Sequence, residues 1–202
     1  MRPPRVLPIT PGVSSSGEAR GLMEDIQRVK DGGGQGVLLR EPQLSDRALL
    51  AVGRFAREVF CDGWLGIHDR VHVALACDAD AAHLGFRSLS PSSARSAGRG
   101  KVEIGHSHHH GELHLQEMEA DYRLIGPVHS TPSKEGVLEP IGLDSLSGIG
   151  MPKETWAVGG LGPAQVADVL AFGLAGVACI RGVFGVGDPA VGIADMMEAV
   201  RS

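Results

Sequence analysis

Four histidines fall within five positions of the stretch GHSHHHGEL, residues 105–113: His106, His108, His109 and His110. Purification tags are unbroken terminal runs, whereas this cluster lies mid-chain and is broken by Ser107, so we treat it as part of the protein. Three interpretations stay open. The cluster could be a solvated polar loop, a source of general acid or base, since imidazole titrates near neutral pH, or a zinc site. Zinc would accept these imidazoles, but their alternation differs from the better-specified i, i+4 spacing on a helix.

Side chains alternate along an extended segment, so positions 106, 108 and 110 share one side and positions 107 and 109 share the other. Histidines also mark three other strand-like runs: His68 closes WLGIH, His83 lies within AAHLG, and His129 follows DYRLIGPV. His72 and His114 fall in helical patterns instead. Seven of the nine histidines therefore gather at or near strand ends.

Glycine-rich stretches indicate an anion site. AVGGLGP (157–163) and IRGVFGVGDP (180–189) each end an apolar run and open a helical pattern. Backbone N–H groups of such turns, with a helix N-terminus, bind phosphate; the alternative is that these glycines only make tight turns. In the stretch STPSK (130–134), Thr131 and Ser133 add hydroxyl groups and Lys134 adds a cation. The candidate phosphate-binding residues are Thr131, Ser133, Gly159, Gly160 and Gly182.

Arg40 ends the run GVLLR and is followed by Glu41, which puts a charge at another strand end. An ordinary exposed arginine is the alternative interpretation. These candidate residues can form one site only in a fold that brings the ends of many strands together.

Eight short apolar runs alternate with longer amphipathic stretches. The predicted strands are 6–10, 36–40, 64–68, 81–85, 102–107, 121–128, 155–160 and 176–184. Most are apolar on both faces, as parallel strands covered by helices are. Eight such units in 202 residues predict a compact (β/α)₈ TIM barrel, whose active site lies at the C-terminal ends of the strands. An open doubly wound sheet would carry a glycine fingerprint after its first strand, and none follows VLPIT.

Helical patterns with start signals separate these strands. We expect N-caps at Ser16, Ser45 and Asp69, a short helix or turn from Ser90, and Pro189 at a first helical position. The other predicted helices are 111–120, 143–150 and 162–173.

Composition excludes several classes of protein. The hydrophobic fraction of 43% suits one domain spanning residues 1–202, and only 4% aromatic residues predicts a core of alanine, valine, leucine and isoleucine. The net charge of −5 includes no basic stripe for nucleic acid, and no run could span a membrane. The proline-interrupted start lacks a signal-peptide pattern, so we expect a cytoplasmic protein with three reduced cysteines.

The stretches LLREPQLSDRALL, IHDRVHVALACDADAAHLG, IGHS, DYRLIGPVHSTPSKEG, WAVGGLGP and GVACIRGVF, from about Val37 to Asp195, resemble the thiamine phosphate synthase family. This family includes the TenI-type thiazole tautomerase branch. The resemblance implies a (β/α)₈ barrel of thiamine biosynthesis that binds a hydroxyethylthiazole phosphate. Synthases of the family join a pyrimidine diphosphate to this thiazole and release diphosphate held by Mg²⁺.

Several positions depart from the synthase pattern. After the second strand, R-E-K becomes Arg40, Glu41 and Pro42; after the third, N-D becomes His68 and Asp69. The G-Q-x-D after the fourth strand becomes Gly85, Phe86, Arg87 and Ser88. One of the two expected carboxylates is therefore missing, and the cation Arg87 lies beside its position. Asp69 is the one metal ligand that the resemblance still implies.

These departures favour the tautomerase branch, whose proton shift needs an acid or base and no metal. That branch has G-H-V where this chain has 126–128, but His129 lies two residues on, with the same parity as Pro127. We therefore expect His129, with His106 or His108, to transfer the proton. Arg40 and Lys134 complete the candidate catalytic residues, and His68 and Ser107 are expected to bind substrate.

Two alternatives stay open: thiamine phosphate synthase, with Mg²⁺, and a barrel that only binds a phosphorylated ligand. The tautomerase would need no cofactor. The expected partner is a small phosphorylated thiazole, and a homo-oligomer is left open.

Overall fold

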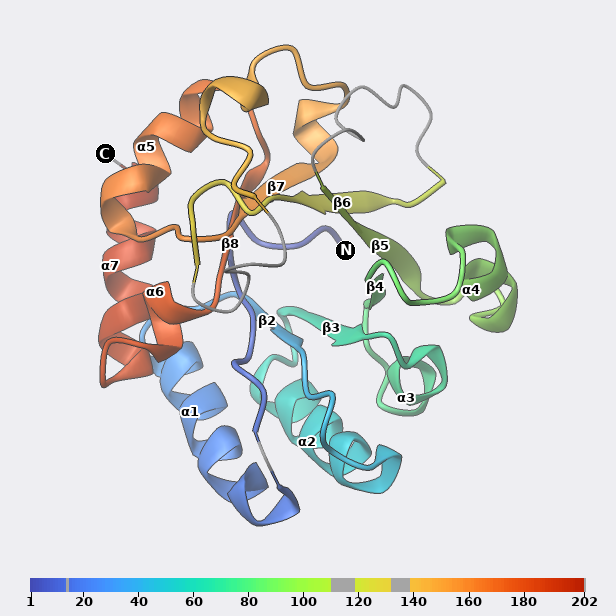
Figure 1. The fold of residues 1–202 in the computed structure, drawn as a ribbon. Helices are drawn as coiled ribbons and strands as arrows, with labels where there is room; N and C mark the ends of the chain where they lie inside the picture. Colours follow the sequence, from blue (N-terminus) through green and yellow to red (C-terminus); the bar gives the residue numbers. More distant parts are fainter. Residues whose placement is uncertain (14, 110–118, 132–138, 202) are drawn as a thin grey trace.

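The computed structural model describes residues 1–13, 15–109, 119–131 and 139–201, and at its centre is one eight-stranded sheet. Neighbouring strands are parallel, in the order β1-β8-β7-β6-β5-β4-β3-β2. A parallel bridge between Ile9 and Leu38 brings the end of β1 beside β2 and closes the ring. Figure 1 shows the ring of strands in the centre, with the helices outside it. The predicted barrel is confirmed.

The strands begin close to the predicted positions. They are β1 (Val6–Pro8), β2 (Gly36–Leu39), β3 (Trp64–His68), β4 (Ala81–Leu84), β5 (Glu103–His108), β6 (Tyr122–Ile125), β7 (Thr155–Val158) and β8 (Gly176–Cys179). The prediction for the last strand was too long, because the chain turns after Cys179 into the short helix α6 (Arg181–Phe184).

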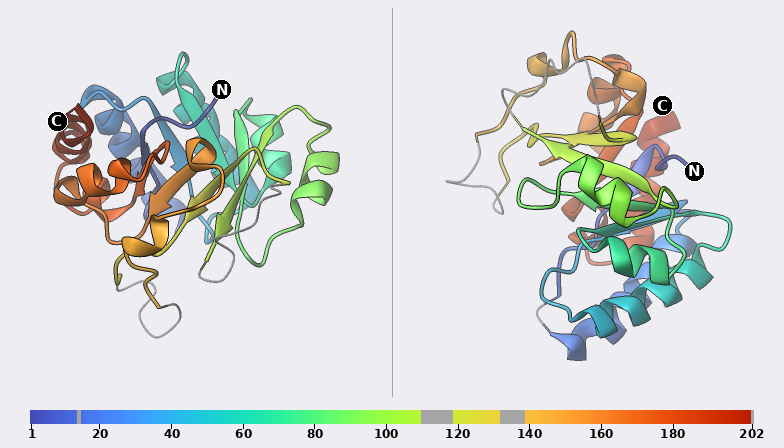
Figure 2. Two further views of the ribbon diagram at one scale, coloured as in Figure 1. Left: turned by 90° about the horizontal axis from the view of Figure 1, so that it is seen from above. Right: turned by 90° about the vertical axis from the view of Figure 1, so that its right-hand side faces the viewer.

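Helices cover the outside of the ring. They are α1 (Ala19–Asp31), α2 (Asp46–Val59), α3 (Val71–Ala76), α4 (Pro91–Ala97), α5 (Pro163–Ala171) and α7 (Pro189–Arg201), with 3₁₀ turns η1 (Ser16–Glu18), η2 (Asp144–Leu146) and η3 (Pro152–Glu154). Figure 2 shows α4 and α5 on opposite sides of the barrel. The helix predicted over 111–120 lies mostly outside the described residues. No helix in the described part of the chain is long and apolar enough to cross a bilayer.

The helix start signals were partly right. The side chains of Ser45 and Ser90 accept hydrogen bonds from the first turns of α2 and α4, as predicted. Asp69 does not cap α3, because the helix begins one residue later than a cap at this position allows and its N-cap is Arg70. Ser16 begins a 3₁₀ turn that precedes α1, and the helix predicted over 143–150 is reduced to the 3₁₀ turn η2.

Two apolar layers hold the barrel together. Aliphatic side chains fill the layer between strands and helices, as the composition predicts; examples are Leu39, Val52 and Ile104. The interior of the ring differs, because Trp64, Tyr122 and Trp156 pack edge to face there, with both ring-centroid distances 5.9 Å. Burying such side chains stabilises the fold by about 1.5–3 kcal/mol each. Both tryptophans and the one tyrosine of the chain thus pack inside the ring.

Glycines make room for these rings. A Cβ on Gly105 would lie 2.1 Å from Cζ of Tyr122, and one on Gly66 would lie 2.4 Å from the Trp64 ring. Only glycine fits at these two inward-facing positions, so side-chain size determines which face of each strand points inward. The same alternation then determines which side chains reach the C-terminal mouth of the barrel.

Candidate active site

Polar side chains continue the inward-facing rows of three neighbouring strands. Following Trp64 and Gly66, His68 is the last residue of β3; His83 follows Ala81 in β4, and Ser107 follows Gly105 in β5. The His68 and His83 ring centroids lie 6.0 Å apart, and Nε2 of His83 lies 2.9 Å from Oγ of Ser107. Because all three side chains point into the ring at the C-terminal ends of their strands, they form one polar floor beneath the mouth.

His83 is the deepest member of this floor. It is 1% exposed, and its Nδ1 lies 3.2 Å from the Tyr122 hydroxyl. Burial holds the pKa of His83 well below its usual 6.5, and the neighbouring imidazoles of His68 and His106 lower it further. Burial likewise raises the pKa of Tyr122 well above 10. At neutral pH both groups are therefore uncharged, and His83 offers one ring N–H and one acceptor nitrogen.

His83 and Tyr122 were missed as functional residues in the sequence analysis. The signal was available, because His83 stands two residues after Ala81 and so shares its face of β4. The pairing of β4 with β5, which brings His83 within reach of Ser107, cannot be read from the sequence.

Asp69 lies just beyond β3 with φ +64, a conformation that non-glycine residues seldom adopt. Its carboxylate accepts a hydrogen bond from Oγ of Ser88, and its Oδ2 lies 3.3 Å from Nδ1 of His68. The His68 hydrogen bond is the largest of the effects that lower the Asp69 pKa to about 2. Asp69 is therefore ionised at neutral pH and already engaged by two side chains.

The Mg²⁺ that the family resemblance implies does not fit this donor set. Mg²⁺ prefers several hard oxygen ligands, usually carboxylates with water and phosphate. Both oxygens of Asp69 are engaged, and the turn after β4 has Ser88 where the family pattern has an acid, next to the cation Arg87. Within the described residues no group of three histidine, cysteine, aspartate or glutamate side chains could hold a metal ion.

His106 and His108 face the other way. Ser107 points inward to His83, so its neighbours on β5 project from the outer face, the side on which Ile104 packs toward the helices. Nδ1 of His106 lies 3.2 Å from Nε2 of His108. The predicted pair on one side of the strand is therefore present, outside the barrel interior. His110 lies outside the described residues.

His109, on the same parity as Ser107, stays near the mouth. Its Nδ1 lies 2.8 Å from the carbonyl oxygen of Gly126 at the end of β6, and its ring approaches that of Phe86 edge to face at 6.3 Å. An imidazole from the original cluster thus does border the mouth.

The glycine pair after β7 lies against the end of β6. Gly159 and Gly160 have φ values of +103 and +66, and a Cβ on Gly160 would lie 2.6 Å from Cβ of His129. The backbone N–H of His129 donates to the Gly159 carbonyl oxygen at 3.1 Å. Nε2 of His129 is buried and has no hydrogen-bond partner in the described chain. His129 and the candidate phosphate turn therefore form one unit.

The remaining candidates divide between described and undescribed positions. A Cβ on Gly182 would lie 2.9 Å from the Leu161 carbonyl oxygen, which places the turn after β8 beside the one after β7. Thr131, 8% exposed, follows His129 by two residues. Ser133 and Lys134 lie outside the described residues.

Arg40 continues the inward row of Leu38 on β2, and its backbone N–H donates to Oγ1 of the buried Thr10 at 2.8 Å. Glu41 is 3% exposed, and its Oε2 accepts from the backbone N–H of Val13 at 2.6 Å. Glu41 was not a candidate in the sequence analysis; its role here is to bind the chain that follows β1 to the end of β2.

Comparison with known proteins gives consistent matches. A family model described as thiamine monophosphate synthase matches residues 6–183. A putative thiamine-phosphate synthase of Geobacter sulfurreducens is 37% identical over 179 residues, covering 84% of this chain and 83% of the relative. Thiamine-phosphate synthase of Moorella thermoacetica is 32% identical over 190 residues, covering 91% and 90%.

Among solved structures, thiamine phosphate pyrophosphorylase from Pyrococcus furiosus superposes with a TM-score of 0.82 at 25% identity, covering 98% of this chain and 95% of that one. The 3-hexulose-6-phosphate synthase of Salmonella typhimurium, with a TM-score of 0.73 at 13% identity, shares the fold alone.

Proposed function

Because this chain belongs to the thiamine monophosphate synthase family of thiamine biosynthesis, we propose that it joins a hydroxymethylpyrimidine diphosphate to a hydroxyethylthiazole phosphate. The observation that carries this proposal is 37% identity, over 84% of the chain, to a relative named for that reaction. The sequence analysis preferred the tautomerase, because several positions depart from the synthase pattern. The names of the relatives favour the synthase instead.

The proposed reaction forms a C–N bond at the thiazole nitrogen and breaks the C–O bond to diphosphate. The protein must hold two rings in line and stabilise the charge that develops on the leaving group. We assign the thiazole phosphate to the turn of Gly159 and Gly160, whose positive φ values suit a close approach of backbone to a ligand and which packs against His129. Ser133 and Lys134 are assigned to the same phosphate by the family resemblance.

The floor of His68, His83 and Ser107 supports the proposal by lining the place where a heterocycle would enter the barrel with polar side chains. Because the pKa of His83 is held well below 6.5, this floor adds no positive charge from His83 at neutral pH. Arg40 is the basic side chain at the neighbouring strand end, and we assign it to the anionic part of the pyrimidine substrate. No step is assigned to a metal ion.

A second candidate, the proton shift within a carboxylated thiazole phosphate, is favoured by one specific observation. Nε2 of His129 is buried without a partner in the described chain, and Cβ of the same side chain lies against the proposed phosphate turn. An imidazole in that place could take a proton from a bound thiazole and return it to another ring atom. His106 and His108 are less suited to this role, since they project from the outer face of β5.

Two assays with the full chain separate these functions. The first supplies both synthase substrates and detects thiamine phosphate by mass spectrometry; the second supplies carboxythiazole phosphate and follows isomerisation by NMR. We expect thiamine phosphate in the first assay. Isomerisation without thiamine phosphate would replace the proposal with the tautomerase. Thermal stabilisation by thiazole phosphate with turnover in neither assay would leave a binding protein.

The His129→Gln variant adds a residue-level test. Proton transfer by His129 would make this variant at least about 100-fold slower in isomerisation, the usual contribution of a general acid or base. In the synthase reaction His129 has no proton to move, so we expect the variant to form thiamine phosphate within about a few-fold of the wild-type rate.

A further inference from the structure

Asp69 is committed to contacts inside the protein. Ser88 donates its hydroxyl hydrogen to Oδ1 of Asp69, and Oγ of Ser88 in turn accepts from the backbone N–H of Gly85 at 2.7 Å. The backbone N–H of Ser88 donates to the Gly85 carbonyl oxygen at 3.0 Å, which closes the turn on itself. The carboxylate after β3 thus fixes the shape of the turn after β4.

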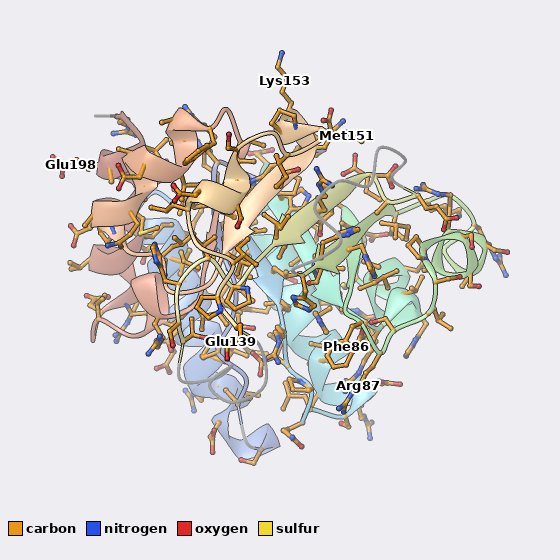
Figure 3. All side chains as sticks on the ribbon, turned by 45° about the horizontal axis from the view of Figure 1, so that its top comes forward. Phe86, Arg87, Glu139, Met151, Lys153 and Glu198 are labelled. Atoms are coloured by element: carbon orange, nitrogen blue, oxygen red, sulfur yellow. The ribbon has the colours of Figure 1, made fainter. Side chains whose placement is uncertain are left out.

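That turn carries Phe86 and Arg87 into solvent at the mouth. Phe86 is 66% exposed, and the Arg87 guanidinium carbon lies 5.1 Å from the centre of its ring. Figure 3 shows both side chains next to each other, on the same side of the barrel as Glu139 and away from Met151 and Lys153. In the described part of the chain no carboxylate forms an ion pair with Arg87. A guanidinium stacked on an aromatic face keeps its N–H edge available to an anion.

Resting on the synthase function proposed above, we propose that Arg87 binds the diphosphate at this side of the mouth, in the place of a protein-held divalent cation. Asp69 is then a positioning residue that holds the Gly85–Ser88 turn, and Phe86 supports the guanidinium. A planar guanidinium can bind two phosphate oxygens at once, and its positive charge offsets part of the negative charge of the leaving group.

The test measures binding of inorganic diphosphate by calorimetry, in EDTA and in excess MgCl₂. It uses the wild type, Arg87→Gln, Arg87→Lys, Asp69→Asn and the control Arg54→Gln, which removes an exposed arginine from the middle of α2. We expect the wild type to bind in EDTA, Arg87→Gln to bind about tenfold more weakly in both buffers, and Arg87→Lys to lie between them. Arg54→Gln should match the wild type.

Asp69→Asn distinguishes positioning from metal binding. A loosened turn should weaken binding by the same factor in EDTA and in MgCl₂, whereas a lost metal ligand would weaken it only in MgCl₂. The proposal is overturned by the second pattern, by a wild type that binds only with MgCl₂ or fails to bind, or by Arg87→Gln that binds like the wild type. Thiamine phosphate formation is measured separately. A failed synthase assay with Arg87-dependent binding therefore rejects the function alone, and normal synthesis with Arg87-independent binding rejects the inference alone.

Discussion

His83 and Ser107 meet inside the barrel, with Nε2 of one 2.9 Å from Oγ of the other across adjacent strands. The other ring nitrogen of His83 lies 3.2 Å from the Tyr122 hydroxyl, so both nitrogens of a buried imidazole are satisfied by hydroxyl groups. This row of hydrogen bonds leaves neither nitrogen of His83 unpaired. Removing one hydroxyl would leave a buried nitrogen without a partner, which lowers the stability of the fold.

Replacing Ser107 with alanine should therefore reduce the free energy of unfolding by about 1–3 kcal/mol, because the buried Nε2 of His83 loses its partner. Urea denaturation measures this change. Ser96→Ala, in the exposed face of α4, is the control and should change stability by less than about 0.5 kcal/mol. Equal effects of the two substitutions would mean that the His83 contact contributes nothing to stability.

Stability should fall as the pH is lowered through the region below 6.5. Burial keeps the His83 pKa well below 6.5 in the folded protein, whereas the unfolded chain takes up a proton near 6.5. The stabilisation is thus complete above 6.5 and decreases toward the folded pKa, by at most about 1.4 kcal/mol per pH unit. Asp69 acts in a separate window, with stability lost as the pH falls from 3.8 toward about 2.

Urea denaturation at pH 7.5, 6.5 and 5.5 measures the His83 effect. The slope should become shallower in His83→Gln, whatever that variant's absolute stability, and should persist in the surface variant His72→Gln. A slope that is unchanged in His83→Gln would assign the pH dependence to other groups.

Arg123→Met should raise the free energy of unfolding, by about 1 kcal/mol or more. The Arg123 side chain is fully buried on the outer face of β6, and only its Nε is paired, donating to Oγ1 of Thr155 at 2.7 Å. Its two terminal nitrogens have no partner in the described chain, and a buried charge without compensation is costly. Arg95→Met, which removes an ion pair with Asp121, should instead leave stability unchanged or slightly lower. Denaturant titration of both variants checks the contrast in sign.

Gly160→Ala should weaken the binding of thiazole phosphate at least tenfold. It forces a side chain into φ +66 and places Cβ 2.6 Å from that of His129, so the proposed phosphate turn must move. Gly173→Ala is a matched control, because it has φ +78 but nothing within 4 Å of the new Cβ. Calorimetry with the thiazole phosphate measures both. Binding by Gly160→Ala at the level of Gly173→Ala would place the phosphate elsewhere.

Much of the barrel was predictable from the sequence, because each strand is a short apolar run whose length and spacing survive in the fold. The end of β8 was not, since the apolar residues of 180–184 continue equally well in a strand or a helix. The cap at Asp69 also failed. Its side chain bonds to Ser88, a contact between two loops that become neighbours only when β3 and β4 pair.

The candidate site was predictable as a location and less so as a set of contacts. Alternation places Ser107 and His106 on opposite sides of β5, but it does not say which side is inside. The fold decides this: the register of β4 and β5 pairs His83 with Gly105, and Ser107, two residues further along the same inward row, contacts His83. The sequence also contains no signal that would assign the three largest interior rings to the centre of the barrel. The placement of two of these rings depends on the space that Gly66 leaves beside Trp64 on the same strand and that Gly105 leaves opposite Tyr122.

The ring is continuous everywhere except between β1 and β2, where the Ile9–Leu38 bridge is supplemented by the contacts from Thr10 to Arg40 and from Glu41 to Val13. This seam carries fewer ladder hydrogen bonds than any other strand pair of the described sheet, and it ends beside Arg40. Local unfolding of the barrel should therefore start here, so that amide hydrogens of residues 9–13 exchange with solvent ahead of those in β3 to β6. The same sparsely bonded seam would let the β2 side of the mouth spread to admit a bulky ligand while the opposite wall stays rigid.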